Sequence, residues 1–469
     1  MQCYHRVTRM PVPLHRDRYP VILVQEARPA PRGLPIAIIG IGQCGADNDD
    51  VRFTHITMPM LSSFRNASPA QLAAALQDAR DYTLALFERF QASGLDDPAR
   101  VPYLTIVNPP LWELGHTAWF AEWFVLREAA TSHPASAQNP CLLDAGDRWF
   151  DSNTVAHATR WTLDLPDTAA IKSYAEEVLQ RVLDKLADTP DDATALYPFR
   201  LALAHEDMHG EAFAYTLQTL GLTAPPILAR ASLPASQQIS TPQRELHFED
   251  ATFQLGSSPA QEFVFDNEKW AHPVHLPAYN ISSTLVSNRE YRRFMLEGGY
   301  DNLQFWSAAG QAWLANTKRY APRYWQRDGK LCERYGMTVA LPDNEPVRHV
   351  SLHEAQAYCR WAGRRLPGEA EWELAALSGR AALPGQSALS EQPDFRWGDL
   401  WEWTSTPFNP YPGFTADRYL EYSAPWFGTH QVLRGASFVT RPRIRSARYR
   451  NFFMPERDDI FAGFRTCAL

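Results

Sequence analysis

The spacing of apolar residues predicts helices in the first half of the chain and short strands in the second. From Ser68, apolar residues recur at helical intervals until Gly94, and Ser68-Pro69 fits an N-cap followed by the first helical residue. The same periodicity predicts three more helices, at residues 111–128, 168–187 and 198–220. Four amphipathic helices within one stretch are typical of a four-helix bundle.

The pattern changes after the Pro225-Pro226 pair. Apolar runs become short and lie between turn residues, as at residues 253–255, 263–265 and 432–433. Helical spacing is predicted again at residues 288–296 and 352–362. We therefore predict a multidomain fold with an α part and an α+β part, a four-helix bundle at residues 60–225 and an α+β domain at residues 226–469.

Residues 1–57 fit neither part. The GxGxxG sequence at residues 40–45 has the glycine spacing of a dinucleotide-binding loop, which requires a helix to begin at the third glycine. The segment Asp47-Asn48-Asp49-Asp50 follows instead, and its three carboxylates would repel a phosphate. We interpret the match as chance. We expect the native protein to start at Met58 or Met60, with residues 1–57 as a disordered or non-native extension.

Composition and charge narrow the class of protein. The 469 residues are 45% hydrophobic and 21% charged, which is ordinary for a globular protein with a large core. Acidic residues outnumber basic ones by 53 to 45, and the net charge of −8 argues against a general nucleic-acid-binding surface. No apolar run is long enough for a membrane span. The 6 cysteines are scattered without CxxC pairs, as in a reducing compartment, so we expect a soluble, cytoplasmic protein.

Three histidines carry the clearest candidate chemistry. His205 and His209 are one turn apart on one face of a predicted helix, so both imidazoles can reach one metal ion. His116 lies in an otherwise apolar stretch of another predicted helix, and bundles build metal sites from facing helices. Three neutral imidazoles leave coordination positions open. That suits a redox metal that binds dioxygen and a substrate better than a closed structural zinc site.

A zinc protease is the alternative. The HExxH spacing of residues 205–209 also occurs in zinc proteases, where the glutamate acts as general base. Such an enzyme also needs an edge strand beside the metal helix to hold a peptide, and the predicted bundle offers none.

Two sets of motifs then resemble a known family. Residues 108–116 (NPPLWELGH) and 205–209 (HEDMH) resemble the DinB-like helical domain of ergothioneine sulfoxide synthases. A second set resembles the formylglycine-generating-enzyme (sulfatase-modifying factor) domain, which has a C-type-lectin-like fold: residues 350–361, 365–373, 401–405, 433–438 and 463–465. This order of domains is that of the EgtB-type family, which the chain resembles over residues 60–469.

The resemblance implies a non-haem Fe(II) enzyme that uses O2 to join sulfur or selenium to C2 of the imidazole of hercynine (Nα-trimethylhistidine). His116, His205 and His209 match the iron ligands. Tyr419 best matches the tyrosine that donates a proton or hydrogen atom, with Tyr422 as the second choice. The hercynine pocket is matched by Asn451, with Phe452 placed to contact the trimethylammonium group by a cation–π interaction.

Departures from the family pattern concern the chalcogen donor. Phe453 stands where bacterial ergothioneine enzymes have an aspartate that helps to hold γ-glutamylcysteine, and Met208 replaces the usual glutamine. The arginines that would bind the peptide carboxylates are not recognisable, and Arg160 is only a weak candidate. These losses favour the selenoneine synthase branch of the superfamily, which uses a neutral selenosugar. Arg457 could still bind an anionic group, which would favour γ-glutamylcysteine or cysteine and a sulfoxide synthase.

Other activities stay open as alternatives. A copper-dependent formylglycine-generating oxidase needs a cysteine pair near its C-terminus, and the matching residues 446–453 contain no cysteine. A zinc hydrolase, a DinB-type thiol transferase and a non-catalytic binding module remain. Because the second domain lacks the cysteine pair, we expect it to serve as a wall of the metal site rather than as an oxidase.

Overall fold

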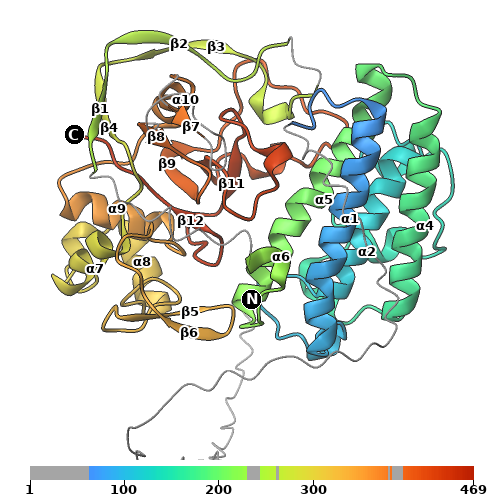
Figure 1. The fold of residues 1–469 in the computed structure, drawn as a ribbon, viewed down its shortest axis with the longest axis horizontal. Coiled ribbons are helices and arrows are strands. Elements are labelled where there is room, and N and C mark those ends of the chain that lie inside the picture. Colours follow the sequence, from blue (N-terminus) through green and yellow to red (C-terminus); the bar gives the residue numbers. More distant parts are fainter. Residues whose placement is uncertain (1–62, 230–242, 260–262, 379–380, 383–393) are drawn as a thin grey trace, which may run out of the picture. The chain divides into compact units, whose positions relative to one another are not determined.

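The computed structural model describes residues 63–229, 243–259, 263–378, 381–382 and 394–469 (Figure 1). The predicted extension at residues 1–57 and both proposed starting methionines lie outside these ranges. Within them, every helix is either too short or too polar to cross a membrane.

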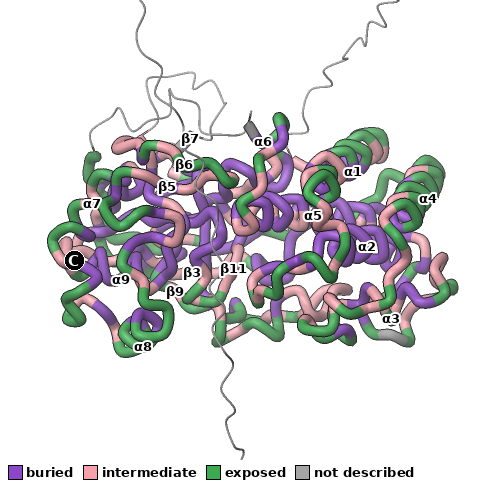
Figure 2. Tube along the Cα trace, turned by 90° about the horizontal axis from the view of Figure 1, so that it is seen from below, coloured by how far each residue is buried: buried purple, intermediate pink, exposed green. Residues whose placement is uncertain are grey.

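Four long helices of the described chain form a bundle, as predicted. In it α1 packs against α5 and α4, and α2 packs against α4 and α5 (Figure 1). Figure 2 shows α2 buried along its length beneath the more exposed α1 and α4. The helices of the described residues are α1 (Pro69–Ala92), α2 (Pro110–Ala121), α3 (Gly146–Phe150), α4 (Thr168–Ala187), α5 (Ala193–Thr219), α6 (Pro226–Ala229), α7 (Asn288–Leu296), α8 (Ala308–Thr317), α9 (Leu352–Trp361) and α10 (Glu369–Leu377).

Capping residues set where the bundle helices begin. Ser68, the predicted N-cap, forms a reciprocal capping box with Gln71 at the start of α1, and Asp167 caps α4, which begins at the predicted residue 168. Helix α5 begins at Ala193, so the predicted start at residue 198 is wrong. Asp192 accepts hydrogen bonds from two amides of the first turn, and Pro198 lies inside the helix, where it removes one backbone donor.

The predicted helix at residues 111–128 also needs correction. Regular α2 ends at Ala121, and the chain continues as a π-helical turn over Glu122–Leu126. The Arg127 amide donates to the Glu122 carbonyl at 2.9 Å, which is the wider i→i+5 closure. The buried Glu122 carboxylate accepts hydrogen bonds from the Leu142 amide and the Tyr174 hydroxyl, which hold this turn in place.

The C-terminal region is an α+β structure, as predicted. Its main sheet has the order β11-β10-β9-β12, with β12 parallel to β9 and the other pairs antiparallel. The strands of the described residues are β1 (Glu245–Phe248), β2 (Ala251–Leu255), β3 (His272–Leu276), β4 (Tyr279–Ser282), β5 (Leu331–Arg334), β6 (Met337–Ala340), β7 (Ala381–Ala382), β8 (Phe395–Arg396), β9 (Trp401–Pro407), β10 (Gln431–Arg434), β11 (Asn451–Phe453) and β12 (Ala462–Gly463).

The predicted strands and helices of this region are only partly confirmed. Two of the apolar runs lie in β2 and β10, and the two predicted helices are α7 and α9. Residues 263–265 form no strand, because they lead directly into the 3-10 turn Asp266–Glu268 and pack their aromatic rings on Phe64. Helices α8 and α10 were not predicted, since each is short and has little amphipathic contrast.

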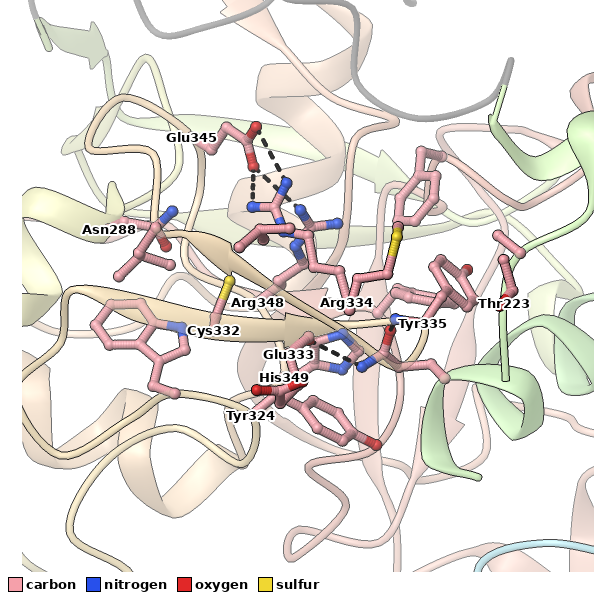
Figure 3. A pocket seen from close by; sticks show the side chains of 18 residues that line it. Thr223, Asn288, Tyr324, Cys332, Glu333, Arg334, Tyr335, Glu345, Arg348 and His349 are labelled. Atoms are coloured by element: carbon pink, nitrogen blue, oxygen red, sulfur yellow. Dashed lines mark hydrogen bonds and ion pairs between the residues drawn. The ribbon is translucent and has the colours of Figure 1, made fainter. Parts of the chain in front are cut away.

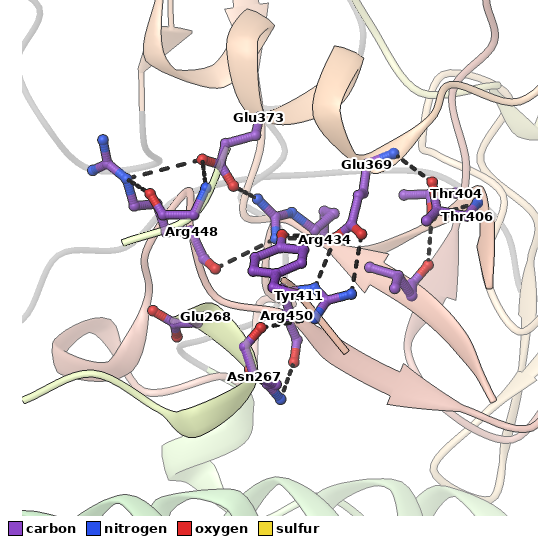
Figure 4. Close-up of polar contacts among 12 residues, drawn as sticks. Asn267, Glu268, Glu369, Glu373, Thr404, Thr406, Tyr411, Arg434, Arg448 and Arg450 are labelled. Atoms are coloured by element: carbon purple, nitrogen blue, oxygen red, sulfur yellow. Dashed lines mark hydrogen bonds and ion pairs between the residues drawn. The ribbon is translucent and has the colours of Figure 1, made fainter. Parts of the chain in front are cut away.

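Buried ion pairs hold the irregular parts of this region together. Figure 4 shows Arg434 and Arg450 directed at two carboxylates of α10, Glu373 and Glu369. Arg450 contacts both oxygens of Glu369, at 2.8 and 3.0 Å, and also donates to the backbone carbonyl of Asn267. Each guanidinium therefore satisfies loop carbonyls as well as a carboxylate, which repays part of the cost of burying it.

Helix α5 also joins the bundle to the C-terminal region. Arg443 donates to both oxygens of Asp207, at 2.8 and 2.7 Å, and both side chains are buried. One turn later, Glu211 accepts hydrogen bonds from Trp401, Ser437 and Thr440 at 2.6–2.7 Å. The helix that carries two of the histidines is therefore anchored to the C-terminal region at two successive turns.

Replacing Arg443 should destabilise the protein strongly. In R443M the Asp207 carboxylate stays buried without its partner, so we expect a loss of about 3–5 kcal/mol of unfolding free energy in guanidinium melts. The loss should shrink as the pH falls, because burial raises the pKa of Asp207 and the unpaired carboxyl then takes up a proton. R181M, which breaks an exposed pair with Glu177, is the control. Equal stability of R443M and R181M would contradict the role of this contact.

Candidate metal centre

Three histidines converge between α2 and α5. His116 comes from α2, and His205 and His209 come from successive turns of α5. Their candidate ligand atoms all lie within 4.8 Å of one another. The centroid of the His116 ring is 5.0 Å from that of each of the other two rings, and those two rings are 4.5 Å apart. The structure therefore brings together the three residues that the sequence singled out as metal ligands.

Hydrogen bonds and stacking fix how the rings are turned. His116 contacts the Phe150 carbonyl oxygen through Nδ1 at 2.7 Å, which makes Nδ1 the donor and leaves Nε2 as a lone-pair nitrogen. His209 contacts Glu113 Oε1 through Nδ1, also at 2.7 Å. The His205 ring lies flat on Phe120, at 3.5 Å between centroids, and its buried Nδ1 has no partner among the described residues.

The electrostatics keep two of these imidazoles neutral. Burial, followed by the neighbouring His209, holds the pKa of both His116 and His205 well below its usual range. Neutral imidazoles are the form that binds a metal ion. Oriented nitrogens within 4.8 Å of one another and an unpartnered buried Nδ1 fit a divalent transition-metal ion.

Glu113 is a functional candidate that the sequence reasoning missed. Its side chain is buried and holds His209 from α2, the helix that carries His116. A carboxylate that accepts from the second nitrogen of a metal-ligating histidine orients the ring and raises its basicity. The available signal was a lone carboxylate three residues before His116 in an apolar helix, the i, i+3 spacing of helical-bundle metal sites.

The glutamate of the HExxH sequence has a structural partner. Glu206 forms a buried ion pair with Arg80 of α1, at 2.7 and 3.1 Å. A carboxylate engaged on both oxygens in this way is poorly suited to take a proton from a metal-activated water. The geometry therefore removes the main support for the zinc hydrolase alternative.

The two candidate tyrosines are neighbours, with ring centroids 6.0 Å apart, but they contact different residues of the site. The Tyr419 ring packs on Phe120 at 5.0 Å and lies 6.2 Å from the His205 ring. Burial and the nearby Glu421 raise the pKa of Tyr419 to about 12. Tyr422 stacks on Phe265 and places its hydroxyl 3.9 Å from Met208 Sδ. Tyr419 is thus the one whose ring reaches a histidine of the cluster.

A cavity of about 240 Å³ opens beside His209. Four of the predicted substrate residues, Met208, Asn451, Phe452 and Phe453, line it. The described lining also includes Tyr215, Trp401 and Tyr449 but contains no lysine or arginine. Asp207 and Glu211, its two carboxylates, are already paired as described above. The cavity is therefore largely apolar and aromatic, with a ligand-binding histidine at one edge.

The two predicted arginine candidates lie outside this lining. Arg457 donates to both oxygens of Asp459, at 2.6 and 2.7 Å, and covers the far side of Phe453 at 5.0 Å from its ring. Arg160 lies over Trp112 at 3.9 Å and donates to Asn108 Oδ1 at 2.7 Å. Burial lowers the pKa of Arg160 to about 10, and no carboxylate of the described residues pairs with it.

Two cysteines of the C-terminal region are buried away from the histidine cluster and have raised pKa values. The four described cysteines are free, and Cys359 and Cys467 are buried. Burial raises the pKa of Cys467 to about 12 and that of Cys359 well above its usual range. Thiols held in this state are poor nucleophiles and poor copper ligands, which disfavours the formylglycine-generating oxidase.

Most of the chain is similar in sequence to known proteins. Residues 230–399 match the sulfatase-modifying factor enzyme 1-like domain. The chain is 34% identical over 435 residues to the hercynine oxygenase of Mycobacterium tuberculosis, a match that covers 85% of this chain and 98% of that protein. The hercynine oxygenase of Mycolicibacterium smegmatis is also 34% identical, with 84% and 97% covered. The formylglycine-generating enzyme of Streptomyces coelicolor is 26% identical over 280 residues, 47% of this chain.

Fold, site and comparisons together define an oxidoreductase in which a sulfatase-modifying-factor-like domain adjoins a helical bundle with a three-histidine site. The chain belongs to the hercynine oxygenase family, whose members are oxygen-dependent enzymes. The predicted EgtB-type resemblance and the predicted enzyme class are thereby confirmed. The selenoneine branch and the roles of individual site residues remain predictions.

Replacing Glu113 should weaken metal binding. In E113Q the hydrogen bond to His209 loses its charge, so we expect metal affinity to fall by about 10–100-fold in equilibrium dialysis with Fe(II) or Co(II). E122Q is a matched control, because Glu122 is equally buried and lies just beyond α2 but contacts no histidine. An E113Q protein that binds metal as tightly as E122Q would show that Glu113 serves only packing.

Proposed function

We propose that the protein is a non-haem Fe(II), O2-dependent enzyme that forms a C–Se bond at the imidazole C2 of hercynine, with a selenosugar as donor. The observation that carries the proposal is the His116, His205 and His209 cluster in a chain that belongs to the hercynine oxygenase family. A C–S bond made with γ-glutamylcysteine or cysteine is the alternative outcome at the same site.

The three imidazoles support iron as the metal. Nitrogen ligands with open positions suit a metal that changes oxidation state, and bound Fe(II) would supply the reduction of O2. Glu113 and the Phe150 carbonyl would hold two of the rings in the ligating orientation. The aromatic rings of Trp112 and Phe120 cover the cluster and exclude water from it.

We place hercynine in the cavity beside His209. Asn451 Oδ1 is occupied by the Phe452 amide at 2.9 Å, so its Nδ2 group is the donor that remains for a ligand. A trimethylammonium group cannot donate hydrogen bonds and is bound best by aromatic faces and by carboxylates nearby. Phe452, Phe453 and Tyr215 supply aromatic surface in this cavity, and Glu211 supplies negative charge at its wall.

Tyr419 is suited to deliver a proton. Its raised pKa keeps the phenol protonated at neutral pH, and Ser152 hydrogen-bonds its hydroxyl. Its ring lies 6.2 Å from the His205 ring and 6.0 Å from the ring of Tyr422, which in turn lies 6.0 Å from the cavity residue Phe452.

The lining of the cavity favours a neutral chalcogen donor. γ-Glutamylcysteine carries two carboxylates, and a buried carboxylate is costly without a cationic partner. The described lining offers no arginine or lysine, and Arg457 is already neutralised by Asp459. Arg160 lies outside this lining, over the ring of Trp112. A selenosugar needs only hydrogen bonds.

The donor can be identified by offering each candidate separately and comparing the rates of product formation. Protein reconstituted anaerobically with Fe(II) should consume O2 only when hercynine and a donor are both present, and mass spectrometry should find selenoneine with the selenosugar. γ-Glutamylcysteine and cysteine, offered separately, should react more slowly by at least about tenfold. Faster turnover with either thiol would reassign the enzyme to ergothioneine synthesis, and no product with any donor would overturn the proposal.

Removing the Tyr419 hydroxyl should slow bond formation without loss of metal. Loss of a positioned proton donor costs about 10²–10⁴-fold, so Y419F should reduce product formation at least about 100-fold. Its iron content should match that of the wild type. Y422F is the matched comparison, because Tyr422 is equally buried but contacts Met208 rather than a histidine. Unchanged turnover in Y419F would assign Tyr419 to packing alone.

A further inference from the structure

A second cavity lies away from the histidine cluster. It has a volume of about 310 Å³ and is enclosed by the β5–β6 hairpin, residues near the end of α5 and the segment around His349 (Figure 3). None of its lining residues lines the cavity beside His209. The proposed reaction assigns it no role.

The cavity has one positive charge in excess. Arg334 and Arg348 both donate to Glu345, at 2.6 and 3.1 Å, so two guanidinium groups share one carboxylate. The three side chains are only 25, 14 and 13% exposed. Glu333 also lines the cavity, but alternation along β5 turns its side chain to the face opposite Cys332 and Arg334, where it accepts a hydrogen bond from Thr338.

Several buried polar atoms around this pair lack partners. Arg334 Nε, Asn288 Oδ1 and the Tyr335 hydroxyl make no hydrogen bond within the described part of the chain. In the view of Figure 3 the two guanidinium groups lie between Asn288 and Tyr335. Burial, and then Arg334, lowers the pKa of Arg348 to about 10, which indicates that its charge is incompletely compensated. The excess cation beside the cavity is therefore the feature that an anionic ligand would compensate.

The remaining walls are apolar and mostly aromatic. They are formed by Tyr324, Trp325, Val339, Leu341, Phe438 and Phe461. Gln218 of α5 holds the hairpin in place, because it donates to the Glu333 carbonyl at 3.1 Å and accepts from the Tyr335 amide at 2.8 Å. Hydrogen bonds therefore hold the shape of the cavity, which is cationic at one end and mostly apolar elsewhere.

We propose that this cavity binds a small organic carboxylate with an aromatic or apolar body. Its carboxylate would lie against Arg334 and Arg348, and its body against the aromatic walls. A single negative charge balances the one excess cation. A phosphate dianion would overcompensate that charge beside Glu345, so a monoanion fits better. This site is independent of the metal and of the proposed reaction.

The test uses 4-fluorobenzoate as the probe on the full-length protein, without metal. The ¹⁹F resonance should broaden with wild-type protein, and the uncharged isostere 4-fluorobenzamide should bind at least about tenfold more weakly. R348Q and R334Q should each weaken benzoate binding by at least about tenfold, since each removes a charge-assisted hydrogen bond. R293Q, an exposed arginine of α7 paired with Glu297, is the matched control and should bind as the wild type does.

A steric variant protects the test against misfolding. V339W fills the cavity from β6 without changing charge, and it should abolish binding while circular dichroism and thermal melting remain native-like. The proposal is overturned if the wild type does not broaden the benzoate signal, if benzamide binds equally well, or if folded R334Q and V339W bind as R293Q does. Failure here leaves the hercynine assay unaffected, because the two sites share no residue.

Discussion

Helix α5 contacts α1, α2 and the C-terminal region through neighbouring side chains, and the geometry of the histidine site depends on these contacts. Each residue advances about 100° around an α-helix. His205 and His209 therefore face α2, while Glu206 turns to Arg80 of α1 and Asp207 and Glu211 turn to the C-terminal region. Because every buried carboxylate on this turn has a partner, the helix is fixed in rotation as well as position. The two histidines inherit that rigidity, which a preorganised metal site needs.

The parts of this arrangement that depend on local spacing could be predicted from the sequence. The i, i+4 histidines, the cap residues Ser68 and Asp167, and the bundle follow from helical periodicity. Two helix limits were predicted wrongly. The start of α5 was placed at Pro198 instead of after its cap Asp192, and α2 passes into a π turn after Ala121. Motif resemblance located Tyr419, Asn451 and the other C-terminal residues, which no local pattern would have brought to the bundle. The division near residue 226 remains a prediction.

The partners of charged residues could not be predicted in the same way. Glu113 with His209, Arg80 with Glu206 and Arg457 with Asp459 are visible only after folding. Two of these pairs join residues roughly a hundred positions apart in the chain. Such pairs changed the functional interpretation, because a charge that looks free in the sequence can be neutralised in the fold. Arg457 illustrates this. An arginine can bind an anionic ligand, but in this fold its guanidinium group is already paired with the carboxylate of Asp459.

The same principle bears on substrate choice. A ligand charge that enters a buried cavity costs desolvation free energy unless a group of opposite charge pairs with it. The unpaired charged side chains in the walls therefore select among ligands of similar shape. Beside His209 the described walls contain no lysine or arginine, so each carboxylate of a ligand would lie there without a cationic partner. Around Arg334 and Arg348 the balance is reversed, and one cation is left over. The described walls of the two cavities therefore differ in charge balance: carboxylates without a guanidinium group line the one beside His209, and two guanidinium groups share Glu345 in the other.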